Sequence, residues 1–487
     1  MKFLIFSLNF NFQLLIMYLK MKGFGLRRLL FPIGIFAATQ FMSCKTDDAV
    51  EDLNGTSDVP KERKEEPSLN YRALFSTHHT IGEEEAKELA LDASSLFSRD
   101  GNGLRSGRMR QICDVRVLHS EESILRSGSG EEMPVPDTLA YVCNFADSAG
   151  FAIICADDRV GCPILAYVGE GMLGEEVDNP GLAIILSNME DYLIGSIRQF
   201  ENEKDSLRQK AEAQLQDDTT CLKRVYTGKY DLISEESVAP LIYTKWDQWP
   251  APYNTYMPYY SSTDSHAPAG CVAVATAQIM AHYEYPESLD GYTFDWKGMK
   301  VSPSAEEKKG KVTPQNQELV ARLMQSIGNH VGMDYGFNES SANTATAVSW
   351  LGSLGYKTAS SGYSWDFAKT YLDEGVPLIM RGYNKKTLKK KKFLWIPVKS
   401  TPIYSDGHAW IVDGYKTTTI KSYSYTVDSD KDVTTTRYLS TSYSNSFLSV
   451  NWGWGGESDS YYAADCFAPK GSDYNFQYGQ ELFVVRR

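Results

Sequence analysis

The chain has 487 residues, with a hydrophobic fraction of 42% and an aromatic fraction of 12%, which is typical of a globular protein with more than one domain. Its formal net charge is −13 at pH 7. This balance disfavours non-specific binding to nucleic acid, because the neutralisation of phosphates requires clustered Lys and Arg. We therefore expect no nucleic-acid partner.

The N-terminus has the features of an export signal. Arg27 and Arg28 precede an apolar run, residues 29–42, that is too short to span a bilayer comfortably. Cys44 follows this run in a context similar to a bacterial lipobox, with Phe41 where Leu is usual. We predict a signal peptide at residues 1–43, with Met21 as an alternative start.

Lipidation of Cys44 would anchor the exported protein to the bacterial outer membrane, from which processing could release it. An ordinary secretory signal is the alternative, and it also exports the chain. Residues 44–69 are rich in charged side chains and are predicted to form a flexible tether.

Residues 70–200 alternate between helical and β-type patterns. Helical spacing of apolar residues predicts a helix at 81–97, and residues 182–216 form a second helical stretch. Between them, two β-type runs at 139–145 and 151–154 flank a short turn and predict a hairpin. We therefore expect a small α+β domain over residues 70–200.

A charged segment separates this domain from the rest of the chain. Residues 201–237 contain Lys223 and Arg224 and are predicted to be an exposed, cleavable linker. Residues 238–487 then form a second domain.

The eight cysteines exclude a common class of metal site. None of them forms a CxxC pair or a CxxC-with-His spacing, so we expect no bound metal and no cofactor. Lipidation of Cys44 would leave an odd number of thiols, so at least one is unpaired.

One of these thiols stands at a helix start. Cys271 opens an Ala-rich apolar stretch, residues 271–283, that predicts a buried helix. Gly270 permits a sharp turn before it. A thiol in the first turn feels the positive end of the helix dipole, which favours the thiolate that a cysteine nucleophile needs.

A histidine from a distant part of the chain can act as its base. His282 lies too far along the same helix, whereas His408 stands between glycines at the start of an apolar strand. Asn451, followed by Trp452, could orient the far imidazole nitrogen. Gln248 could donate a side-chain N–H to an oxyanion, beside the backbone N–H of Cys271.

The second domain resembles the streptopain family of papain-like cysteine peptidases. The resemblance lies in residues 247–254, 270–280, 333–336, 407–414 and 451–456, in the family's order. It implies an α+β, two-lobed fold with a helical lobe and an antiparallel β-sheet lobe.

The resemblance also assigns roles to individual residues. It implies that Cys271 is the nucleophile, His408 the general base and acid, and Gln248 the oxyanion donor. It further implies that Asn451 with Trp452 supports the imidazole, while Ser341 and Gly407 line the substrate cleft.

The first domain is similar to the inhibitory prodomain of the same family. The combination implies a zymogen of a cysteine endopeptidase that acts on proteins or peptides. Its own prodomain is the intramolecular inhibitor, and cleavage between about Cys221 and Ser237 is expected to activate it. A hydrophobic substrate side chain one position upstream of the scissile residue is also implied.

The chain departs from the family at two inserts, which lie on either side of His408 and follow Gly382 and Gly414. The first contains a Lys run, residues 385–392, that is either a solvated hairpin tip or a site for an anionic partner. Two alternative functions stay open: a transglutaminase-like acyl transferase, and a catalytically silent module that binds peptides at the surface.

Overall fold

The computed structural model describes most of the chain beyond residue 68. The described residues are 69–76, 78–97, 110–119, 124–126, 132–134, 136–174, 177, 179–215, 225–300, 313–389, 392–393, 396–397, 401–427, 436–467 and 480–487. All of them belong to the unit Asp58–Arg487. The predicted signal peptide, Cys44 and the tether up to residue 68 lie outside them.

The N-terminal part is a helix-and-sheet unit, as the alternating patterns predict. The predicted helices are present as α4 and α5, and the predicted hairpin is present as β4 and β5. Its elements are α3 (Tyr71–Phe75), α4 (Glu83–Phe97), β1 (Ile112–His119), β2 (Ile124–Arg126), β3 (Glu132–Pro134), β4 (Thr138–Phe145), β5 (Phe151–Cys155), β6 (Ile164–Val168) and α5 (Pro180–Leu215).

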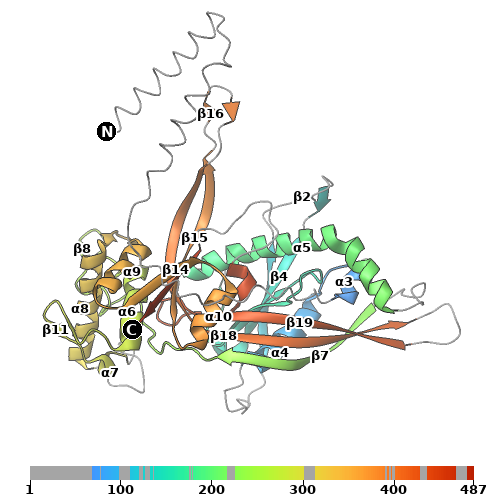
Figure 1. Ribbon diagram of the computed structural model, residues 1–487, viewed down its shortest axis with the longest axis horizontal. Coiled ribbons are helices and arrows are strands. Elements are labelled where there is room, and N and C mark those ends of the chain that lie inside the picture. Colours follow the sequence, from blue (N-terminus) through green and yellow to red (C-terminus); the bar gives the residue numbers. More distant parts are fainter. Residues whose placement is uncertain are drawn as a thin grey trace, which may run out of the picture. The chain divides into compact units, whose positions relative to one another are not determined.

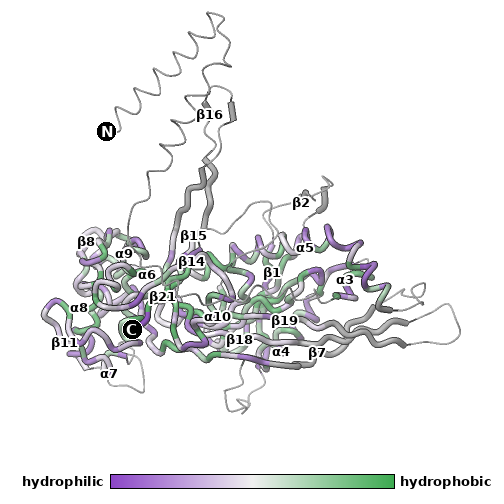
Figure 2. The backbone as a smooth tube through the Cα atoms, viewed as in Figure 1, coloured by the Kyte–Doolittle hydropathy of each residue, from purple (hydrophilic) through white to green (hydrophobic). Residues whose placement is uncertain are grey.

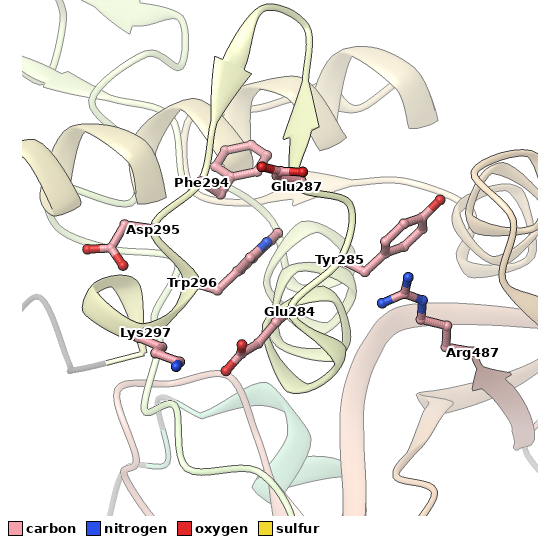
Figure 3. Close-up of a pocket in the computed structure, with 8 residues that line it drawn as sticks. All are labelled: Glu284, Tyr285, Glu287, Phe294, Asp295, Trp296, Lys297 and Arg487. Carbon is pink, nitrogen blue, oxygen red and sulfur yellow. The ribbon is translucent and has the colours of Figure 1, made fainter.

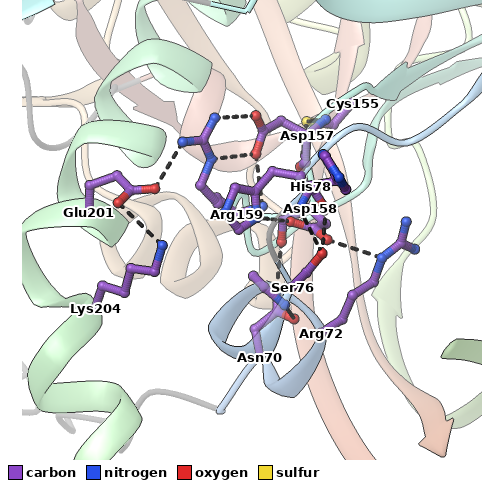
Figure 4. Close-up of polar contacts among 12 residues, drawn as sticks. Asn70, Arg72, Ser76, His78, Cys155, Asp157, Asp158, Arg159, Glu201 and Lys204 are labelled. Atoms are coloured by element: carbon purple, nitrogen blue, oxygen red, sulfur yellow. Dashed lines mark hydrogen bonds and ion pairs between the residues drawn. The ribbon is translucent and has the colours of Figure 1, made fainter. Parts of the chain in front are cut away.

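A polar network joins α5 to the segment after β5 (Figure 4). Arg159 donates to both carboxylate oxygens of Asp157, at 2.9 and 2.6 Å, and to Glu201 of α5 at 2.9 Å. Asp158, next in the chain, pairs with Arg72 of α3 at 3.0 Å. The network therefore fixes two helices to the segment that follows β5, an interior strand of the sheet.

The C-terminal part contains helices and a set of antiparallel strands. The helices are α6 (Cys271–Tyr283), α7 (Trp296–Met299), α8 (Pro314–Val331), α9 (Thr344–Ser353) and α10 (Trp365–Asp373). The longer strands are β14 (Lys357–Gly362), β15 (Leu378–Lys389), β18 (Thr401–Val427), β19 (Thr436–Asn451), β20 (Ser460–Ala463) and β21 (Glu481–Arg486). Two-residue strands complete the set: β8 (Tyr259–Tyr260), β9 (Ser265–His266), β10 (Ser288–Leu289), β11 (Tyr292–Thr293), β12 (Asp334–Tyr335), β13 (Ser340–Ser341), β16 (Lys392–Phe393) and β17 (Ile396–Pro397).

One sheet runs through both parts of the described chain. Its order is β1-β4-β5-β6-β20-β19-β18-β15-β21-β14, and each strand in this order pairs antiparallel with its neighbours. The junction is the pair β6 and β20, in which Tyr167 stands opposite Tyr461. The two domains predicted from the sequence therefore share backbone hydrogen bonds. The α+β class is confirmed.

The sheet separates two hydrophobic cores. Side chains alternate along a strand, so neighbours in β18 point to opposite faces. Trp410 and Val412 pack in the core that contains α4 and much of α5, whereas Ile411 packs with α6, α8 and α9. Figure 2 shows the hydrophilic outer end of α5, beyond the residues that reach this core. The strand residues around His408 therefore sit between the N-terminal unit and α6.

The segment predicted as a linker is partly regular structure. Residues 201–215 continue α5, and most of the remainder belongs to β7 (Val225–Val238), which pairs with β18. Residues 216–224, which include Cys221, lie outside the described residues. β7 could not be predicted from the sequence, because an edge strand forms through backbone hydrogen bonds to a neighbouring strand, and charged side chains such as Glu235 do not prevent these bonds.

Both inserts lengthen strands of the central sheet (Figure 1). The first lets β15 and β18 pair from Leu378 opposite Val412 out to Lys389 opposite Thr401. The second extends the pairing of β18 with β19 as far as Val427 opposite Thr436. Residues 385–389 are thus strand and Lys392 begins β16, whereas residues 390–391 lie outside the described residues. Among the described residues, no helix has both the length and the apolar character that a membrane span requires.

Candidate active site

Cys271 is the first residue of α6, as predicted. Gly270 precedes it with φ of 91°, a conformation that favours glycine. A Cβ atom at Gly270 would lie 2.8 Å from the Met333 sulfur and 3.0 Å from the Ser340 carbonyl oxygen. The glycine therefore allows both the turn and the close approach of the neighbouring segment to the helix mouth.

A cleft of about 500 Å³ opens at this helix mouth. It is lined by five of the residues singled out in the sequence, namely Gln248, Cys271, Ser341, Gly407 and His408. Its other walls include Trp249, Arg381, Tyr383, Ala409 and Trp454. The structure thus brings the nucleophile and base candidates to one cleft from helix and sheet.

The Cys271 thiol is half-buried and faces β18. The backbone N–H of Ala409 donates to its sulfur at 3.4 Å. Burial raises the pKa of the thiol, and the N–H groups of Ala409, Val272 and Cys271 itself oppose this shift only in part. In this form of the protein, the desolvation of the thiolate thus outweighs its stabilisation by the N-terminus of α6, and the neutral thiol is favoured.

His408 is buried, and one of its ring nitrogens is fixed by a hydrogen bond to the backbone. Its Nε2 lies 3.0 Å from the carbonyl oxygen of Trp452, which leaves Nδ1 as the other ring nitrogen for chemistry. Burial lowers the pKa of the imidazole to about 4, against a smaller opposing effect of the hydrogen bond to Trp452. Burial therefore favours the uncharged forms of both groups in the shared cleft, the imidazole of His408 and the thiol of Cys271.

The predicted role of Asn451 needs correction. Its side chain does not contact the imidazole but joins α6 to the segment before it. The Asn451 amide donates to the Thr244 carbonyl at 2.9 Å, and its Oδ1 accepts from Gln278 at 3.0 Å and from the Gly453 N–H at 3.1 Å. The family resemblance implied the orienting role for Asn451, but the hydrogen bond to the imidazole comes from the backbone carbonyl of Trp452.

Trp452 is held in place through other groups. Its indole N–H donates to the Ser458 carbonyl at 3.0 Å, and its backbone N–H donates to Asp459 at 2.8 Å. Burial raises the pKa of Asp459 to about 8. Asp459 was missed from the sequence, where it stands in a polar stretch without a pattern, whereas Gln278 could have been found as a polar residue on the buried helix α6.

Gln248 is one of the residues that line this cleft. It is buried, and its backbone carbonyl accepts from the Ala269 N–H at 3.1 Å. Its own N–H donates to Asp247 at 2.6 Å. These bonds tie the Gln248 segment to the loop that leads into α6.

The N-terminal unit reaches into the same cleft. Pro180, the first residue of α5, lines it. A Cβ atom at Gly181 would lie 2.2 Å from Cε3 of Trp452 and 2.9 Å from Cδ2 of His408. Asn179 caps α5 by accepting from the Gly181 and Leu182 N–H groups at 3.0 and 3.1 Å. The start of α5 thus packs directly on the imidazole.

Other candidate groups lie elsewhere. His266 and His330 contact the Met257 carbonyl and Asp290, and neither lines the cleft. A second pocket, of about 440 Å³, is lined by charged and aromatic residues such as Glu284, Trp296 and Arg487 (Figure 3). It contains none of the predicted site residues. Within the described ranges, no group of His, Cys, Asp and Glu is arranged to hold a metal ion.

Comparison with known proteins identifies both parts of the chain. Residues 246–462 match the peptidase C10 family, and residues 79–193 match the Spi protease inhibitor family. The chain thus carries a C10-family peptidase domain. The C10 family is the streptopain family, so the resemblance seen in the sequence is confirmed.

Individual relatives agree with this assignment. Streptopain of Streptococcus pyogenes serotype M1 is 25% identical over 370 residues, which cover 68% of this chain and 74% of the relative. The thiol protease/hemagglutinin PrtT of Porphyromonas gingivalis is 24% identical over 362 residues, which cover 66% of this chain and 33% of the relative. The C10 match contains Cys271, His408 and Gln248, and the inhibitor match contains the start of α5.

Proposed function

We propose that this chain is the exported zymogen of a cysteine endopeptidase. The observation that carries the proposal is the shared cleft of Cys271, His408 and Gln248, against which the inhibitor-like domain places Pro180 and Gly181. The helices around α6 and the strands around β18 would then be the two lobes of a papain-like fold.

In the proposed reaction, His408 takes the thiol proton of Cys271 through Nδ1. The sulfur then attacks the scissile carbonyl carbon, and the oxyanion is stabilised by the Cys271 N–H and the Gln248 amide. Collapse breaks the C–N bond as the imidazolium protonates the leaving amine. A water molecule deprotonated by His408 then hydrolyses the acyl-enzyme.

The precursor would be inactive for two reasons. The start of α5 occupies space beside the imidazole, and burial disfavours the charged thiolate–imidazolium pair. We propose that cleavage between about Cys221 and Ser237 releases the N-terminal unit. A cut inside β7 would also require that strand to separate from β18, and an N-terminal lipid on Cys44 would anchor the precursor to the outer membrane.

Peptide hydrolysis is tested with purified chain after processing. We expect a casein substrate to be cut into new fragments, and Cys271→Ala to leave it intact. Crosslinked rather than cut products would instead support the acyl transferase. Binding of peptides without any turnover would support the silent module.

A further inference from the structure

A charged pair stands in the sheet wall of the cleft. Arg381 of β15 lines the cleft and lies opposite Ala409 of β18 on one side and Glu481 of β21 on the other. Ala409 is also the residue whose N–H contacts the Cys271 sulfur. The guanidinium is thus one strand away from the residue that contacts the nucleophile.

The positive charge of Arg381 is already balanced. Its Nη2 donates to Glu481 at 2.5 Å, and its Nη1 lies 3.3 Å from Oδ1 of Asn343, which also lines the cleft. The guanidinium lies 5.3 Å from the Phe483 ring centre, which limits its movement. The pair therefore forms a fixed and nearly neutral patch.

The guanidinium nevertheless retains unused donors. Arginine has more N–H groups than these two contacts occupy, and its buried Nε has no hydrogen-bond partner among the described residues. The side chain is 23% exposed, so part of it faces the cleft. A substrate side chain that enters beside Ala409 would therefore meet N–H donors of Arg381 that still lack an acceptor.

The binding energy at this wall would depend on the chemical type of the substrate side chain. An aliphatic group would remove water from the N–H donors and offer no acceptor in return. A carboxylate would gain a hydrogen bond but would approach Glu481, and Glu339 lines the same cleft. A neutral carboxamide offers the acceptor without the repulsion.

We propose that the subsite walled by Arg381, Asn343 and Ala409 selects a substrate Gln or Asn, with Arg381 as the specificity-determining residue. The inference rests on the proposed peptidase function. It differs from the hydrophobic preference that the family resemblance implies, because the sheet wall here carries an ion pair.

A positional-scanning library of fluorogenic peptides tests this subsite with the processed enzyme. At the position one residue upstream of the scissile residue, we expect kcat/KM for Gln or Asn to exceed that for Leu at least about tenfold. Arg381→Leu should reverse this order at that position alone. Glu481→Gln, which leaves the guanidinium unbalanced, should raise cleavage of peptides with Glu at the same position by about tenfold.

Arg486→Leu is the matched control, because Arg486 also pairs with a glutamate, Glu374, but at the surface. Its cleavage profile should equal that of the wild type. A wild-type preference for Leu or Phe, or profiles unchanged in both the Arg381 and Glu481 variants, would overturn the subsite assignment while cleavage itself persisted. A library left uncut by enzyme whose Cys271 reacts with a thiol inhibitor would instead contradict the proposed function.

Discussion

The contact between Gly181 and the imidazole predicts that one added methyl group loosens the zymogen. In Gly181→Ala the new Cβ would meet buried indole and imidazole carbons at 2.2 and 2.9 Å. Trp452 is fully buried, so it cannot turn away to make room. Overpacking of this kind costs about 1–3 kcal/mol, which corresponds to a shift of about 5–150-fold towards the undocked state.

The assay is the rate at which an epoxide thiol inhibitor labels Cys271 in the intact precursor, followed by mass spectrometry before processing occurs. Gly169→Ala is the control, since nothing lies within 4 Å of a Cβ at that glycine. We expect faster labelling of Gly181→Ala and no change in the control. Equal labelling rates for both variants and the wild type would refute the argument that α5 restrains the site.

Three further predictions concern buried polar groups. Asn451→Ala should lower the free energy of unfolding by about 1–3 kcal/mol, because Gln278 loses its acceptor, whereas kcat of the folded enzyme should change little. A large fall in kcat with unchanged stability in urea would contradict this. Burial raises the pKa of Asp413 to about 7, so the stability from its bound proton is fully present below the ordinary carboxyl pKa of about 4 and is lost as the pH rises to about 7. Asp413→Asn should therefore flatten the decline in urea midpoint between about pH 4 and about pH 7, and an unaltered slope would exclude Asp413 as its source. Asp157→Ala should lower the free energy of unfolding of the precursor by about 1–3 kcal/mol, and with it the melting temperature, because Arg159 then keeps only Glu201 as a side-chain partner. An unchanged melting temperature would show that the network in Figure 4 does not stabilise the precursor.

Local patterns in the sequence predicted the helix that carries the nucleophile. The Ala content and apolar character of the stretch after Gly270 favoured a buried helix, and α6 spans Cys271–Tyr283. The Gly-flanked apolar run around His408 likewise indicated a strand, although β18 begins earlier, at Thr401. The spacing of apolar residues and the positions of the flanking glycines were sufficient here, because local contacts determine these two elements.

Contacts between distant segments were not accessible in this way. The carbonyl that holds His408 belongs to the backbone of Trp452, and any residue type could supply it. The pair of Arg381 with Glu481 depends on the register of β15 with β21, which no local pattern specifies. The packing of Gly181 on the imidazole likewise requires the three-dimensional arrangement of α5 and β18.

The central claim is that the Cys271 sulfur performs the chemistry. Its most direct test is intact-mass and peptide mapping of the processed enzyme after reaction with an epoxide thiol inhibitor. We predict a single adduct on Cys271 with complete loss of peptidase activity. An adduct on Cys466, the other thiol that the processed enzyme would keep, or full activity in an enzyme alkylated at Cys271, would contradict the account.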